Sequence, residues 1–286
     1  MSTVIDLTPP SSDPAIRTST QPLSATEVKR FNDDGFLVKN FGFSTELIES
    51  VIEDVYPHYS EQFRANPVGP ERLRNGWKQL PNVKTLAIAP QVLDALEQLW
   101  GRKALAFQTL NFPTGTSQKI HSDIIHFNTE PSGFMAGVWI ALEDIGESNG
   151  PLIYYPGSHK MPELTMADLK LQAGREHYAE YEVAIDNLVK ENGLKPSLGT
   201  VKKGDAIIWH SNLLHGGYPH QDVKRSRHSQ VTHYFFENCR YYTPMLYNKN
   251  DKKVFDHPEW VNQMPISFMQ RVKNKIARTM GVNKAT

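Results

Sequence analysis

Residues 104–142 read ALAFQTLNFPTGTSQKIHSDIIHFNTEPSGFMAGVWIAL, and they indicate the fold class most clearly. Its short runs of aromatic and β-branched residues are interrupted by Pro, Gly, Asn and Asp, which is typical of an all-β sandwich or barrel. Runs of the same kind recur downstream. We therefore expect a mainly β domain with strands at residues 105–112, 120–127, 134–142, 152–155, 206–210 and 231–236.

Upstream of this β region the sequence predicts flanking α-helices. Ser24 and Glu27 have the spacing of a capping box, in which each side chain bonds the backbone of the other residue. Ser44 is placed to cap a second helix, which has one apolar stripe at helical spacing. A third helix runs through residues 92–100, and Gly101 is suited to end it in a left-handed conformation.

The remaining segments suggest how the chain is organised. Residues 1–23 are polar and rich in Pro and Ser, and they lack the apolar stretch of a secretory signal, so we expect a disordered N-terminal tail. Residues 24–286 are expected to form a single domain, although the length alone would also allow two small ones. Residues 161–198 are too long for a plain loop and suggest an inserted helical lid. Residues 240–286 form a C-terminal extension with a basic end.

Composition narrows the class of partner. Lys plus Arg and Asp plus Glu both number 31, so the chain has no net charge and lacks the electrostatic footprint of a nucleic-acid or anionic-membrane binder. No apolar run approaches the roughly 20 residues that cross a bilayer. Cys239 is the only cysteine, which excludes an intramolecular disulfide and fits the reducing cytoplasm. We expect a small-molecule partner and leave the oligomeric state open.

Three side chains form a candidate metal site. His121 and Asp123 are two residues apart, so on a strand they would point to the same side, and His215 follows a later predicted strand. Two imidazoles and one carboxylate on one face of a metal are the pattern of non-haem Fe(II) oxygenases. A His-x-Asp triplet is weak evidence by itself, and His220 and Asp222 form a second one. We interpret that second pair as solvated loop residues.

An ordered set of short motifs extends this observation. Along the chain lie Asp33-Asp34-Gly35-Phe36, His121-Ser122-Asp123, Asn149-Gly150-Pro151-Leu152, Pro156-Gly157-Ser158-His159, Gly204-Asp205 and Leu214-His215-Gly216. Over about residues 24–240 this set resembles the phytanoyl-CoA dioxygenase family. The resemblance implies a double-stranded β-helix, that is, a cupin-like jelly roll. It also implies Fe(2+) held by the His-Asp-His residues, and 2-oxoglutarate that is decarboxylated to succinate as O2 is consumed.

The same family uses an arginine after the distal histidine to bind the far carboxylate of 2-oxoglutarate, because a guanidinium fork bonds both oxygens. Arg225 and Arg227 are the candidates, and the register of the last strand favours Arg227. Ser229 lies on the same strand face as a possible helper. The resemblance also suggests, more loosely, that Gln108 and Trp139 contact the co-substrate, although both are equally compatible with ordinary packing.

Other histidines keep alternative interpretations. A buried histidine is more often hydrogen-bonded in the core than bound to a metal, and only the complete ligand set outweighs that interpretation. His126 has the opposite strand parity to His121, so a surface role and a pocket role are equally open. His159 is expected to stabilise a turn. His210, five residues before His215, is the alternative distal ligand.

The leading functional hypothesis is therefore an Fe(II)- and 2-oxoglutarate-dependent dioxygenase. We expect it to hydroxylate, cyclise or desaturate a small specialised or carbohydrate-like metabolite, because the balanced charge shows no dedicated basic surface for a CoA nucleotide. The alternatives are an acyl-CoA hydroxylase with the same mechanism, a non-catalytic metal- or sugar-binding jelly roll, and a zinc hydrolase. Arg227 discriminates among them, since only an oxygenase of this kind requires an arginine positioned for a dicarboxylate.

Overall fold

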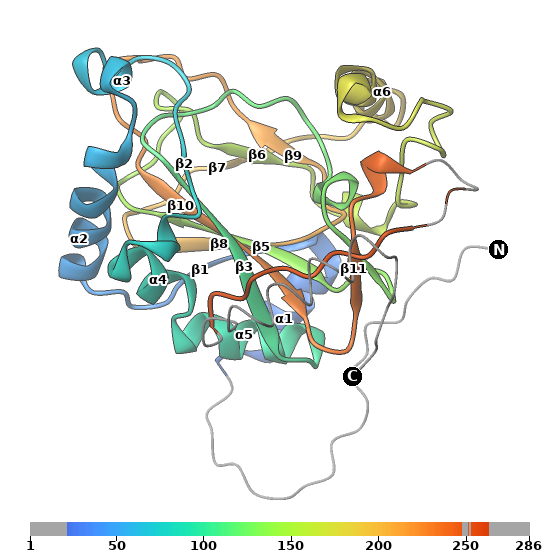
Figure 1. Ribbon diagram of the computed structural model, residues 1–286, viewed down its shortest axis with the longest axis horizontal. Coiled ribbons are helices and arrows are strands. Elements are labelled where there is room, and N and C mark those ends of the chain that lie inside the picture. The colour runs from blue at the N-terminus through green and yellow to red at the C-terminus, as the bar shows by residue number, and fades with distance from the viewer. Residues whose placement is uncertain (1–21, 248–250, 252, 263–286) are drawn as a thin grey trace, which may run out of the picture.

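Strand β5 (Met135–Ala141) runs through the middle of a six-stranded antiparallel sheet ordered β1-β8-β5-β10-β3-β2. A second sheet, ordered β7-β6-β9, lies across from it, while β4 and β11 form a separate pair (Figure 1). The computed structural model describes residues 22–247, 251 and 253–262. Two facing antiparallel sheets of this kind form a jelly roll, so the predicted mainly β, cupin-like fold is confirmed.

The strands and α-helices have the following bounds. The strands are β1 (Phe36–Asn40), β2 (Leu73–Arg74), β3 (Ala104–Phe112), β4 (Asn128–Glu130), β5, β6 (Leu152–Tyr154), β7 (Ser197–Gly199), β8 (Asp205–His210), β9 (His215–Gly217), β10 (Ser229–Phe236) and β11 (Arg240–Tyr242). The α-helices are α1 (Ala25–Asp34), α2 (Thr45–Val55), α3 (Glu61–Ala65), α4 (Pro81–Ala87), α5 (Pro90–Trp100) and α6 (Tyr178–Glu191).

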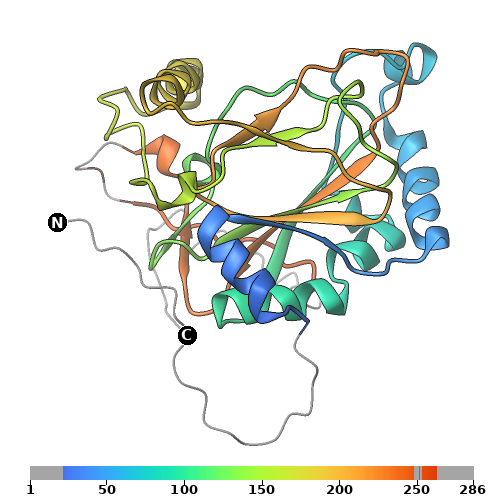
Figure 2. The same ribbon diagram turned by 180° about the vertical axis from the view of Figure 1, so that it is seen from behind.

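The six-stranded sheet is covered on both faces, and alternation along β5 shows how. Ala136, Val138 and Ile140 pack with the N-terminal helices in the largest core cluster, whereas Trp139 packs in the layer between the two sheets. Helices α1, α4 and α5 lie along the outer side of this sheet (Figures 1 and 2). The inner layer, between the sheets, is therefore the part of the fold that can enclose a site.

The predicted helix starts and stops agree with the structure. Ser24 Oγ accepts a hydrogen bond from the Glu27 amide, and the Glu27 carboxylate accepts one from the Ser24 amide, which is the capping box. Gly35 ends α1 with φ of +82°, and a Cβ there would lie 2.3 Å from the His159 ring. Leu23, assigned to the tail from sequence, is fully buried, so the packed domain includes it. Residues 1–21 lie outside the described residues.

One predicted strand is wrong. Residues 120–127 do not form a strand, because the chain makes a single bridge at His121 and then turns through the 3-10 segment Asp123–Ile125 before β4 begins. The turn buries both Ile124 and Ile125 completely. An apolar pair inside a tight turn has the same local pattern as a buried strand, so the sequence could not separate the two.

The insertion at residues 161–198 contains helix α6, which stands apart from the sheets in Figure 1. Its buried face packs with Ile125 and Leu214, so the insertion is attached beside the candidate site. In the C-terminal extension, Val261 is fully buried and its amide bonds Ala106 O at 2.7 Å. The basic stretch at 271–284 lies outside the described residues. Within the described part, none of the helices has the length and apolar character needed to span a membrane.

Candidate metal centre

His121 and His215 are brought together by the backbone. Each amide donates to the carbonyl of the other residue, at 2.9 and 3.0 Å, which makes the two residues a hydrogen-bonded antiparallel pair. Side chains of such a pair project from the same face, and the two imidazole ring centroids lie 4.4 Å apart. The bridge therefore extends the three-stranded sheet by one residue and places two potential ligands side by side.

Both imidazoles are oriented in the same way. Nδ1 of His121 lies 2.9 Å from the carbonyl oxygen of Lys119, and Nδ1 of His215 lies 3.0 Å from that of Leu213. A carbonyl oxygen can only accept, so each Nδ1 carries the proton and each Nε2 keeps its lone pair. Backbone partners of this kind fix the tautomer and direction of metal-binding histidines.

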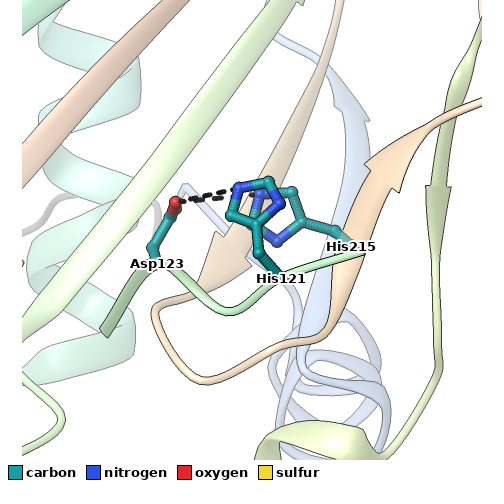
Figure 3. A group of neighbouring side chains, drawn as sticks. All are labelled: His121, Asp123 and His215. Carbon is teal, nitrogen blue, oxygen red and sulfur yellow. Dashed lines mark ion pairs between the residues drawn. The ribbon is translucent and has the colours of Figure 1, made fainter. Parts of the chain in front are cut away.

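Asp123 completes the group from the adjacent 3-10 turn. Its Oδ1 lies 3.7 Å from His121 Nε2 and 3.8 Å from His215 Nε2, and Figure 3 shows the carboxylate pointing at both rings. One ligand atom from each residue falls within 4.8 Å of the others. The other carboxylate oxygen, Oδ2, accepts a hydrogen bond of 2.7 Å from the indole Nε1 of Trp209. Trp209 thus leaves Oδ1 free to face the histidines.

The protonation states suit a cation. Burial lowers the pKa of His121 to about 3, so its imidazole is neutral near pH 7. Burial alone would raise the pKa of Asp123, but the nearby histidines and the Trp209 N–H outweigh it and bring this pKa to about 2. Neutral imidazole and ionised carboxylate are the forms that bind metal. A buried carboxylate beside two lone pairs is stabilised by a positive ion between them.

Trp209 provides a first test of this arrangement. Changing Trp209 to Phe keeps an aromatic ring but removes the bond to Asp123, and we expect Fe(II) affinity to fall about 10- to 100-fold, the usual cost of losing an outer partner of a metal ligand. Competition with a coloured Fe(II) chelator measures this. Trp100→Phe is the matched control, because Trp100 donates to Gly133 O away from the site. Equal losses in both variants would argue against a positioning role for Trp209.

Gly137 makes room for Trp209. The two residues are directly opposite each other in the β5–β8 register, and a Cβ at position 137 would lie 2.1 Å from the Trp209 ring. Such overpacking typically costs about 1 to 3 kcal/mol. We expect Gly137→Ala to lower the free energy of unfolding by that amount in chemical denaturation and to weaken Fe(II) binding. Gly146→Ala, where nothing lies within 4 Å, is the control and is expected to change neither quantity.

The His-Asp-His group opens into a pocket of about 240 Å³ that also contains Arg227. This guanidinium is 2% exposed and lies over the Trp139 ring at 5.2 Å. Its Nε donates to Gly150 O and its Nη1 to Ser229 Oγ, each at 2.9 Å. Burial lowers the pKa of Arg227 to about 10, which leaves it charged near pH 7. Within the described residues it forms no ion pair, so an anion bound in the pocket would neutralise this buried positive charge.

The other predicted co-substrate residues lie nearby. Trp139 is fully buried, and its Nε1 has no hydrogen-bond partner among the described residues. Ser229 contacts Arg227 directly. Gln108 lines the same pocket, but its Oε1 accepts from Nδ1 of His233 at 3.1 Å, so it serves that histidine at least in part. Arg227, Trp139, Ser229 and Gln108 thus lie close together, and their roles toward a co-substrate stay predictions.

Several alternatives from the sequence lie elsewhere. His210 packs against Trp100 and His159, so it does not face the His-Asp-His group. His159 lies in the turn after Pro156-Gly157, with Nε2 3.1 Å from Asn32 O. Arg225 is exposed and donates to Ser148 Oγ. Asp222 lies in an exposed loop, as expected, but the expectation of a solvated side chain is wrong for His220, whose Nε2 is buried and whose Nδ1 accepts from the Gly115 amide. His126 lines the pocket, with Nε2 3.3 Å from Tyr178 Oη.

Two residues beside the Asp123 carboxylate were not predicted from the sequence. His233 Nε2 lies 3.9 Å from Asp123 Oδ2, and Trp209 holds that same oxygen. The alternation of β10 and β8 could have placed both side chains on the inner face, but nothing in the local sequence indicates which inner residues reach the metal ligands. That information is carried by the register between strands.

The donor set fits iron(II). Two imidazole nitrogens and one carboxylate oxygen lie on one side, and the pocket lies on the other, which leaves positions open for further ligands. A thiolate site is excluded by composition, since Cys239 is the only cysteine. A buried arginine in the same cavity fits a dicarboxylate bound next to the metal. The fold and site together define a jelly-roll protein with a two-histidine, one-carboxylate metal centre.

Comparison with known proteins supports the same class of protein. The phytanoyl-CoA dioxygenase (PhyH) family model matches residues 31–229, and the chain belongs to that family. The family resemblance inferred from the motifs is thereby confirmed. The chain is 26% identical over 165 residues to the peroxisomal phytanoyl-CoA dioxygenase of Homo sapiens, with 53% of this chain and 45% of that protein covered. It thus spans under half the length of this relative.

Other relatives are covered more fully. An ectoine dioxygenase of Bordetella parapertussis is 25% identical over 221 residues, covering 68% of this chain and 70% of that protein. Among solved structures, EctD from S. alaskensis with 2-oxoglutarate and 5-hydroxyectoine has a TM-score of 0.60 at 19% identity, covering 88% of this chain and 91% of that one. The alpha ketoglutarate dependent carbocyclase SnoK from nogalamycin biosynthesis also has a TM-score of 0.60, at 15% identity over 78% and 88%. These likenesses establish the shared fold.

Proposed function

We propose that this protein is an Fe(II)- and 2-oxoglutarate-dependent dioxygenase that oxidises a small molecule. His121, Asp123 and His215 hold the iron, and Arg227 with Ser229 binds the far carboxylate of 2-oxoglutarate. The observation that carries the proposal is the buried guanidinium of Arg227, which has no ion pair among the described residues and lies in the same pocket as the His-Asp-His group. A buried charge without a partner is costly, and a dicarboxylate reaching from the metal would neutralise it.

Each side chain has a defined task in this proposal. Bound iron supplies dioxygen activation, with electrons from the oxidative decarboxylation of 2-oxoglutarate to succinate and CO2. The chain supplies geometry: the carbonyl-bound imidazoles and the Trp209-bound carboxylate hold three ligand atoms on one side. Arg227 orients the co-substrate along the pocket, and the pocket walls place the target C–H bond next to the metal.

We further propose that residues 161–198 act as a lid over this pocket. The contacts of α6 support this role. Tyr181 Oη accepts from the Ser122 amide at 3.4 Å, directly between two proposed ligands, and Tyr178 Oη contacts His126 in the pocket. A helix joined to the ligand-bearing turn by such contacts is placed to exclude water when substrate is bound. We also propose that residues 24–286 form a single domain.

Succinate release tests the proposed reaction. Purified protein supplied with Fe(II), 2-oxoglutarate and O2 is expected to release succinate, and the rate should rise when a panel of acyl-CoA thioesters, sugars and specialised metabolites includes the substrate. Zn(II) in place of iron should give no turnover. A zinc hydrolase would instead act without O2 or 2-oxoglutarate, and a binding module would bind metal or sugar without releasing succinate. Either outcome would reject the dioxygenase.

A further inference from the structure

Three exposed arginines line the outer part of the metal-containing pocket: Arg72, Arg74 and Arg175. Arg227, in contrast, is buried at its inner end. Within the described residues none of the three outer arginines forms an ion pair. Asp123 is the only acidic side chain among the described residues that line the pocket, and Trp209 and the histidines already surround it. The mouth of the pocket therefore carries positive charge that no ion pair among the described residues neutralises.

Arg74 lies in β2, Arg72 directly precedes this strand, and both line the pocket. Residues two apart on extended backbone share a face, and Leu73 between Arg72 and Arg74 packs on the main core. Strand β2 is fixed in place by its register with β3, in which Arg74 lies opposite Leu110. Asn75 ends it in a left-handed conformation, with its amide bonded to Thr109 O at 2.7 Å. The two guanidinium groups are thus attached to a firmly held edge strand.

Arg175 comes from a different segment, at the start of the 3-10 turn Arg175–His177 that leads into α6. Gly174 precedes it with φ of +139° and ψ of 152°, a conformation essentially restricted to glycine. The Gly174 amide donates a hydrogen bond of 2.8 Å to Met245 O, which connects this part of the insertion to the C-terminal extension. The pocket mouth is therefore lined by arginines from both β2 and the lid segment.

The charges of these arginines extend into the pocket. Burial is the main reason that the pKa of His126 is lowered, but Arg175 and Arg72 contribute to this shift. Since His126 and all three arginines line the pocket, the arginines are close enough to act on whatever occupies it.

We propose that Arg72, Arg74 and Arg175 bind an oxyanion, a carboxylate or a phosphate, carried by the substrate at the end away from the reacting carbon. Like charges on two segments repel each other, and an anion bound between them offsets this repulsion. The planar guanidinium of arginine can donate two parallel hydrogen bonds to either kind of oxyanion. An anionic substrate would therefore hold β2 and the lid segment together while its other end reaches toward the metal. This inference rests on the proposed function and specifies its substrate class.

The inference changes the expectation drawn from composition. A net charge of zero over the whole chain favoured a specialised or carbohydrate-like metabolite over an acyl-CoA, but net charge says nothing about how charges are distributed. Locally, the pocket mouth is basic.

Three matched probes test the inference: hexyl phosphate, hexanoate and hexanol. Titration calorimetry is carried out without oxygen on protein loaded with Fe(II) and saturating 2-oxoglutarate, so that Arg227 is already occupied. We expect at least one anionic probe to bind about tenfold or more tightly than hexanol, with binding weakened by salt. The stronger of the two anions identifies phosphate or carboxylate as the group recognised.

Substitutions of the three arginines test whether they bind the anionic probe. Arg72→Gln, Arg74→Gln and Arg175→Gln are each expected to weaken the anionic probe about threefold or more, and the triple variant about 30-fold. Arg225→Gln, an exposed arginine outside the pocket, should change nothing. Equal binding of hexanol and the anions, no binding of either anion, or no effect of the triple substitution overturns the inference.

The same samples separate this inference from the proposed function. The affinity for 2-oxoglutarate is measured first, in the wild type and in each variant. Protein that does not bind 2-oxoglutarate contradicts the proposed function. Protein that binds 2-oxoglutarate normally but does not prefer the anionic probes contradicts the substrate class alone.

Discussion

Replacing Asp123 by alanine is expected to abolish oxygenase turnover, with a loss of at least about 100-fold, because losing a metal ligand costs more than losing one of its outer partners. Asp123 is 4% exposed, so the change also removes a buried charge and leaves the Trp209 N–H without its acceptor. The fold should persist, since the side chain contributes little apolar core. Succinate release measures turnover, and thermal unfolding checks the fold.

Two further variants make this prediction specific. Asp123→Asn keeps an oxygen for Trp209 but lacks the negative charge, so it should fold like the wild type and still lose turnover. Asp222→Ala alters the second His-x-Asp triplet, which lies in an exposed loop, and should leave turnover unchanged. Normal activity in Asp123→Ala, or an equal loss in Asp222→Ala, would remove Asp123 from the metal site.

Replacing Arg227 by alanine is the second change with a large expected effect. Hydrogen bonds to charged groups contribute about 1.5 to 3 kcal/mol each. A loss of about 2 to 4 kcal/mol raises the 2-oxoglutarate concentration needed for half-saturation roughly 30- to 700-fold. Fe(II) binding in the absence of 2-oxoglutarate should be unaffected, because Arg227 contacts Gly150 and Ser229 rather than the histidines.

Arg225→Ala is the control for this variant. It removes an arginine two residues away that is exposed and contacts Ser148. We expect it to leave the 2-oxoglutarate dependence unchanged. If the two variants had the same affinity for 2-oxoglutarate as the wild type, the anion that neutralises Arg227 would have to be sought elsewhere.

Much of the fold was predictable from local signals. Ser24 and Ser44 cap helices as expected, and Gly101 ends α5 in the left-handed region. The runs that became β3, β5, β8 and β10 were recognisable because they are rich in aromatic and β-branched residues. Short strands such as β9 were missed, since three residues carry too little periodicity to stand out.

The site was predictable in part. His121, Asp123, His215 and Arg227 could be chosen because their order along the chain matches a family pattern, and the structure places all four around one pocket. The geometry behind this differed from expectation: Asp123 reaches the histidines from a 3-10 turn, not from a continuous strand.

The remaining site residues depend on register. Trp209 reaches Asp123 because Gly137 lies opposite it on the neighbouring strand, and His233 approaches from the other side of that glycine. Arg72 and Arg175 are far apart along the chain, and only the tertiary fold brings both to the lining of one pocket. Such pairings are properties of the tertiary structure and leave no trace in local sequence.

We propose that one pocket binds Fe(II) and 2-oxoglutarate together. Anaerobic titration of the Fe(II)-loaded protein with 2-oxoglutarate, with visible absorption recorded, tests this proposal. We predict a metal-to-ligand charge-transfer band that requires both components, is absent from Asp123→Ala, and needs much more 2-oxoglutarate in Arg227→Ala. A wild-type protein without the band, or a band of equal strength in Asp123→Ala, would contradict the claim.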